Sequence, residues 1–147
     1  MADRKTQKLL EGLQQDLERE LSAMLQYLYQ SSVLLGPSAV SIAPFLKHGA
    51  DEELQHAAFL SDQIVNLGGL PKLTAPKISE TRDLRQMLDN DLDRERECIL
   101  EFRERVKQAE IMGELGLKIQ LERLIEEETQ QMRSLERILR GWATGPA

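Results

Sequence analysis

The chain has 147 residues, of which 41% are hydrophobic, 30% are charged and only 4% are aromatic. This length and composition favour one soluble domain with a buried core, and so few aromatic residues count against a strand-rich protein. The formal net charge of −6 excludes the basic footprint of a nucleic-acid-binding domain, so we expect no nucleic-acid partner. A single cysteine excludes an internal disulfide framework and a thiolate zinc cluster.

The hydropathy pattern predicts a protein that neither crosses a membrane nor binds one. No run of about 18 apolar residues is present, which is the length that a spanning helix needs. The N-terminal residues Asp3, Arg4 and Lys5 are charged, and no apolar signal core follows them. We therefore expect a cytoplasmic location.

Apolar residues recur every three or four positions along most of the chain, which predicts long helices in a single domain spanning residues 1–147. Glycine and proline mark the joints between the helices. We predict helices over about residues 5–35, 41–67, 81–112 and 117–140. Pro44 would lie in the first turn of the second helix, where a missing N–H costs little, and Thr81 would cap the third.

The connections predict how the helices pack. Short joints follow the first and third helices, so each of these should lie antiparallel to the next helix. The segment from Gly68 to Glu80 is longer, and about 13 extended residues reach roughly 43 Å, close to the length of one helix. The sequence therefore predicts an all-α, antiparallel four-helix bundle with one long crossover between helices two and three.

Each predicted helix carries one glutamate inside its apolar stripe, close to the middle of the helix. For each glutamate, the positions three or four residues before it and four and seven residues after it are apolar or aromatic. Ligand-type residues also follow two of the acids by one turn, His56 after Glu53 and Gln131 after Glu128. The four acids are Glu20, Glu53, Glu95 and Glu128.

Four converging carboxylates indicate a cation site. Glutamate is almost never fully buried unless it is paired, and four such groups without cations would repel one another. Two divalent cations would balance the four negative charges. Oxygen ligands with one imidazole suit iron or manganese.

Each of these residues has a simpler interpretation when taken alone. A single glutamate on an apolar stripe is usually a boundary residue, and a single histidine is usually a satisfied core residue. One acid per helix, each near the middle of its helix, favours the metal site. His48 has no such acid one turn before it on an apolar stripe, and we expect it at the surface. A shift of one residue on the last helix would offer Glu127 and Gln130 instead, but these share a face with polar residues, so Glu128 and Gln131 are preferred.

Three segments give the chain a resemblance to bacterioferritin and the ferritin-like di-iron carboxylate family. They are Glu20-Leu-Ser-Ala-Met-Leu-Gln-Tyr27, Asp51-Glu-Glu-Leu-Gln-His-Ala57 and Ile64-Val-Asn-Leu-Gly-Gly-Leu-Pro71. The segment Met87-Leu-Asp-Asn-Asp-Leu92 continues the match, which covers about residues 5–140. The resemblance implies a ferritin-like bundle in which two Fe(II) ions are oxidised by O₂ or H₂O₂.

The resemblance also implies a role for each residue. Glu20 and Glu95 would be terminal ligands, one for each metal, and Glu53 and Glu128 would bridge the two metals. His56 would bind one metal through a ring nitrogen. Tyr27 would lie close by, as a hydrogen-bond donor to a ligand or as an electron source.

The sequence departs from the bacterioferritin pattern at three places. Gln131 stands where a second histidine ligand is expected, and its carbonyl oxygen is a weaker ligand than imidazole. Leu54 stands at the position of the haem-ligating methionine, so no haem is expected. After Arg140 no sequence for a fifth helix is evident, so we expect a homodimer built from the side of helices one and two, with a larger cage as the alternative. Cys98, one turn after Glu95, either faces the site or packs as a small apolar residue.

Three functions remain open from the sequence. The first is a di-iron ferroxidase of the bacterioferritin type, serving iron storage or detoxification. The second is a rubrerythrin-like or manganese–iron peroxidase or oxidase that forms no storage cage, which Gln131 and Cys98 favour. The third is a non-catalytic helical interaction protein with a decayed site.

Overall fold

The computed structural model describes residues 3–143 and contains four helices in that range. They are α1 (Arg4–Val33), α2 (Pro37–Asn66), α3 (Leu84–Ile111) and α4 (Leu115–Ala143). None of these helices has an apolar stretch long enough to cross a membrane. The described part of the chain is therefore the all-α bundle that the sequence predicts.

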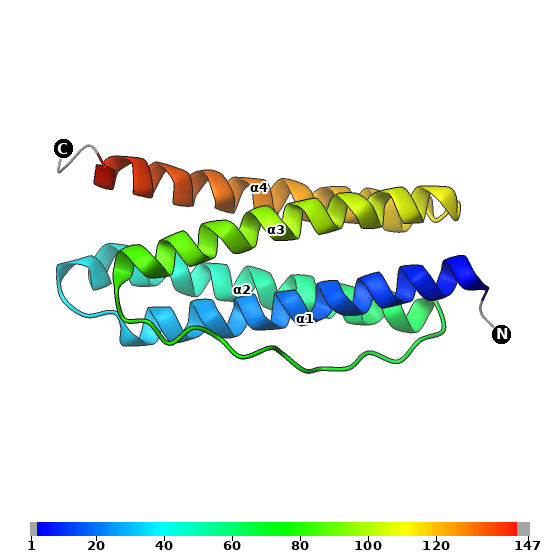
Figure 1. Ribbon diagram of the computed structural model, residues 1–147, viewed down its shortest axis with the longest axis horizontal. Coiled ribbons are helices and arrows are strands. Elements are labelled where there is room, and N and C mark those ends of the chain that lie inside the picture. The colour runs from blue at the N-terminus through cyan, green and yellow to red at the C-terminus, as the bar shows by residue number, and fades with distance from the viewer. Residues whose placement is uncertain (1–2, 144–147) are drawn as a thin grey trace.

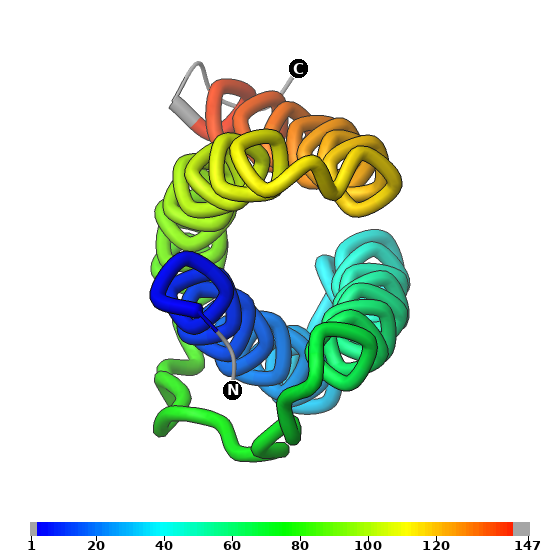
Figure 2. Tube along the Cα trace, turned by 90° about the vertical axis from the view of Figure 1, so that its right-hand side faces the viewer, coloured from blue at the N-terminus to red at the C-terminus, as the bar shows by residue number. Residues whose placement is uncertain are grey.

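The helices form two antiparallel pairs. Helix α1 packs mainly on α2, α3 packs mainly on α4, and α1 also contacts α3 (Figures 1 and 2). The segment between α2 and α3 runs along the outside of α1 from one end of the bundle to the other (Figure 1). The predicted long crossover is confirmed.

Glutamine side chains of α1 hold the crossover in place. The Gln14 side chain donates to the Lys72 carbonyl at 3.0 Å and accepts from the Lys72 N–H at 2.9 Å. Gln26 bonds in the same way to the backbone of Ser79, at 2.7 and 2.8 Å. These paired bonds satisfy backbone groups of a segment that has no secondary structure of its own.

Some predicted boundaries are wrong. Helix α2 begins at Pro37, four residues before the predicted start, and Pro44 lies inside the helix rather than in its first turn. Gly36, with φ of 85°, redirects the chain, and Pro37 then occupies the first helical position, which suits its fixed φ and missing N–H. Helix α3 begins at Leu84, because Asp83 rather than Thr81 caps it by accepting the Gln86 N–H.

The interior has two apolar clusters with a polar layer between them. One cluster contains Leu13, Leu17 and Phe102, and the other contains Leu46, Leu88 and Leu135. On all four helices the acids of the predicted site lie in sequence between the members of the two clusters. Leu28 of α1 is 46% exposed, so it lies outside this interior.

Candidate metal centre

The predicted ligand residues all lie in the interior of the bundle, and the structure brings four of them into one group. Helix α1 contributes one acid, α2 contributes an acid and the histidine one turn later, α3 contributes one acid, and α4 contributes an acid and a glutamine. All of these side chains are buried, with at most 7% of their surface exposed. They are Glu20, Glu53, His56, Glu95, Glu128 and Gln131.

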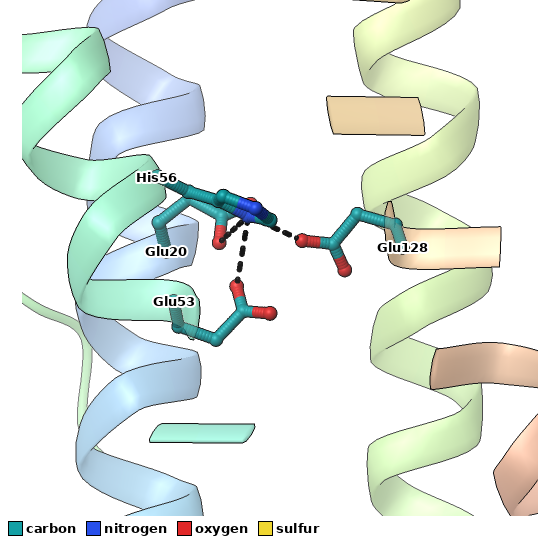
Figure 3. A group of neighbouring side chains, drawn as sticks. All are labelled: Glu20, Glu53, His56 and Glu128. Carbon is teal, nitrogen blue, oxygen red and sulfur yellow. Dashed lines mark hydrogen bonds and ion pairs between the residues drawn. The ribbon is translucent and has the colours of Figure 1, made fainter. Parts of the chain in front are cut away.

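Four of these side chains form a compact group around one imidazole (Figure 3). Glu20, Glu53, His56 and Glu128 each offer a ligand atom, and these atoms lie within 4.8 Å of one another. The Nδ1 atom of His56 is 2.8 Å from Oε1 of Glu128, 3.6 Å from Oε2 of Glu20 and 3.9 Å from Oε2 of Glu53. One ring nitrogen therefore faces three carboxylates that come from three helices.

Glu95 and Gln131 lie outside this compact group and are linked to each other through Tyr27. The Tyr27 O–H donates to Oε1 of Glu95 at 2.6 Å, and the Gln131 side-chain N–H donates to the Tyr27 oxygen at 3.4 Å. Burial raises the pKa of Tyr27 well above its ordinary value, and the charge of Asp91 adds to this effect. Tyr27 therefore keeps its proton and holds the Glu95 carboxylate.

Each carboxylate of the site has at least one oxygen without a hydrogen-bond partner in the described part of the chain. Within the described residues, both oxygens of Glu20 and the Oε2 atoms of Glu53, Glu95 and Glu128 are buried without a hydrogen-bond partner. Buried polar atoms are almost always paired, and a buried unpaired carboxylate is costly. Such oxygens occur on all four helices, and a bound cation would stabilise their negative charges, which otherwise repel one another.

Burial and charge crowding alter the acid–base properties of the group. Burial, with the neighbouring charge of Glu128, raises the pKa of Glu20 from 4.5 to about 8. Burial alone would lower the pKa of His56, but its hydrogen bond to Glu128 and the nearby charges of Glu20 and Glu128 raise it from 6.5 to about 11. Without a metal, a protonated His56 is thus a counter-ion for the carboxylates that surround it.

The preferred register of α4 agrees with the burial pattern. Glu128 and Gln131 are buried, whereas Gln130 is exposed and the side chain of Glu127 is 50% exposed. The carboxylate of Glu127 nevertheless contacts Nε2 of His56. Sequence reasoning missed this contact, because Glu127 lies off the apolar stripe among consecutive glutamates.

The structure also shows the exposure of three other residues that the sequence analysis discussed. His48 is exposed and pairs with Glu52 at 3.2 Å, as expected for a surface histidine. Leu54 is 52% exposed on the outside of α2. Cys98 is buried in the same apolar cluster as Leu17, and burial with the charge of Glu20 raises its pKa well above the ordinary value, so its thiol stays protonated.

Comparison with known proteins agrees with the four-helix fold described above. The family model for a ferritin-like domain matches residues 10–143. The fold is similar to a ferritin-like di-iron carboxylate protein from Bacillus anthracis, with a TM-score of 0.91 and 30% identity over 94% of this chain and 99% of that one.

Two more distant relatives are also similar. A bacterioferritin from Rhodobacter capsulatus, solved with a metal-free dinuclear site and a haem iron, has a TM-score of 0.86 and 26% identity over 95% of this chain and 88% of that one. A nutrient stress-induced DNA-binding protein from a Nostoc species is 26% identical over 130 residues, which covers 82% of this chain and 71% of the relative.

Proposed function

The chain belongs to the ferritin-like domain family, and on that premise we propose that it is a di-iron ferroxidase, oxidising Fe(II) with O₂ or H₂O₂. The observation that carries this proposal is a set of buried carboxylate oxygens without hydrogen-bond partners among the described residues. They belong to Glu20, Glu53 and Glu128 around His56, and to Glu95 beside Tyr27. Oxygen-rich sites with an imidazole suit Fe(II), and also Mn(II).

We assign the residues to two metal positions. Glu20 and His56 would hold one ion, and Glu95 and Gln131 would hold the other, with Glu53 and Glu128 shared between them. The compact group around Nδ1 of His56 supports the first position. Tyr27 supports the second, because its O–H leaves one Glu95 oxygen bonded and the other free.

The chemistry requires electrons and protons in equal number. Two Fe(II) ions as substrate supply two electrons, which with two protons reduce O₂ to H₂O₂, or reduce H₂O₂ to two waters. The buried carboxylates favour the more highly charged Fe(III) product over Fe(II), because the attraction between opposite charges is strong where water is excluded.

Oxygen uptake after anaerobic loading with Fe(II) tests this function. The wild-type chain should oxidise bound Fe(II) rapidly, and Glu53→Gln should slow oxidation strongly because the proposed shared ligand loses its charge. Glu52→Gln is the matched control, since it removes the same charge from the adjacent residue outside the site. Oxidation by Glu53→Gln at the wild-type rate would refute the assignment.

The second candidate is a rubrerythrin-like or manganese–iron peroxidase or oxidase that stores no iron. Gln131 favours it, since an amide in place of a second imidazole makes the two metal positions chemically unequal. A rate with H₂O₂ far above the rate with O₂, and activity with manganese in one position, would support this candidate over the ferroxidase.

We also propose a cytoplasmic homodimer without haem. Exposed leucines on α1 and α2 support an apolar contact between two copies, and Leu54 among them offers no donor atom to a haem iron. Light scattering distinguishes the dimer from a closed cage, and absorbance after incubation with haemin tests for haem binding. The exposed leucines are Leu25, Leu28 and Leu54.

A further inference from the structure

The ring of His56 lies between two consecutive glutamates of α4. Its Nδ1 atom faces the buried Glu128 carboxylate at 2.8 Å, and its Nε2 atom contacts the carboxylate of Glu127. We propose that Glu127 is a positioning residue, which accepts a hydrogen bond from Nε2–H and thereby leaves Nδ1 free to bind the metal. This inference rests on the proposed function.

The positions of the carboxylates assign the two ring nitrogens. A neutral imidazole carries one proton, and the nitrogen that binds a metal must be the one without it. Nδ1 faces Glu20, Glu53 and Glu128, so the metal position lies on that side. The acceptor on the opposite nitrogen fixes both the tautomer and the orientation of the ring, as carboxylates behind metal-binding histidines generally do.

Two consecutive residues reach the same ring because they lie on different faces of α4. Successive side chains of an α-helix point about 100° apart, since one turn takes about 3.6 residues. Glu128 is 1% exposed and belongs to the interior, whereas the side chain of Glu127 is 50% exposed. Removal of the Glu127 carboxylate therefore leaves no buried cavity, and its variants should fold.

The role predicts a specific loss of metal affinity. Loss of such a supporting carboxylate typically weakens metal binding by about 10- to 100-fold. We expect this loss for Glu127→Ala and a smaller loss for Glu127→Gln, whose amide oxygen still accepts a hydrogen bond. Glu126→Ala is the matched control, because it removes the same charge from an exposed neighbour and should leave affinity unchanged.

Nitrogen-15 NMR of histidine-labelled protein with Zn(II) reads the ring directly. The chain has only two histidines, and His48→Gln assigns their signals. In the wild-type protein with Zn(II), we expect Nε2 of His56 to carry the proton and Nδ1 to shift on binding. A titration against a competing chelator, followed at the His56 signals, gives the affinity of each variant.

The possible results distinguish failure of the proposed metal site from failure of the role of Glu127. If the wild-type chain binds no Zn(II) at His56, the proposed metal site itself is wrong. If it binds Zn(II) and Glu127→Ala binds equally well, or Glu126→Ala loses as much affinity, only the role of Glu127 is overturned. Zn(II) bound at Nε2 would overturn that role as well.

Discussion

A buried acid next to the candidate centre should lower the stability of the protein as pH rises. Asp91 of α3 is 1% exposed, and its Oδ1 accepts a hydrogen bond from the Gln30 side chain at 2.8 Å. The other oxygen of each side chain is buried without a partner among the described residues. Burial raises the pKa of Asp91 from 3.8 to about 7, against the opposing effects of Gln30 and Arg94.

The sign of the effect follows from proton binding. Between the two pKa values the folded state holds a proton that the unfolded state has lost, so the free energy of unfolding falls as pH rises. At about 1.4 kcal/mol per pH unit, the difference between the two pKa values corresponds to about 4 kcal/mol, of which about 3 kcal/mol falls between about pH 5 and about pH 8. In Asp91→Asn this loss is absent, because the amide carries no charge and still accepts from Gln30.

Guanidinium unfolding of metal-free protein, in the presence of a chelator, measures the effect. The stability of Asp91→Asn relative to wild type should increase by about 3 kcal/mol between about pH 5 and about pH 8. Asp89→Asn is the control, since the Asp89 side chain is 47% exposed and forms a long surface pair with Arg85. A relative stability of Asp91→Asn that does not change with pH would refute the reasoning.

Three further substitutions test other contacts. Gln131→His should tighten binding of the second Fe(II) ion in an anaerobic titration, and unchanged affinity would exclude position 131 as a ligand. Tyr27→Phe leaves Oε1 of Glu95 without the Tyr27 donor and should lower the free energy of unfolding by about 1–3 kcal/mol in denaturant. Asp16→Asn removes the charge that Arg105 contacts at 2.8 Å in the interior, and should cost about 3 kcal/mol by the same measurement. A cost near zero would show that the remaining Glu101 contact suffices for Arg105.

The sequence predicted the four helices, the crossover and the buried acids, because apolar periodicity marks the inner face of each helix. A glutamate within such a stripe can be located without any tertiary information, which is why Glu128 was preferred over Glu127. The start of α2 was misplaced because Pro44 was read as a first-turn residue, whereas Pro37 already fills that position.

Contacts between helices could not be predicted in the same way. The contact of Glu127 with His56 and the pairing of Gln30 with Asp91 depend on how helices rotate and shift against each other. The same holds for the glutamines of α1 that bind the crossover backbone, since one periodic pattern is compatible with several such arrangements.

The most direct test of the central claim is the number of Fe(II) ions that the chain binds without oxygen. Anaerobic titration, followed by equilibrium dialysis and iron analysis, should show saturable binding of about two Fe(II) per chain, and Glu128→Ala should abolish binding at both positions. The absence of saturable binding, or unchanged binding in Glu128→Ala, would contradict the account.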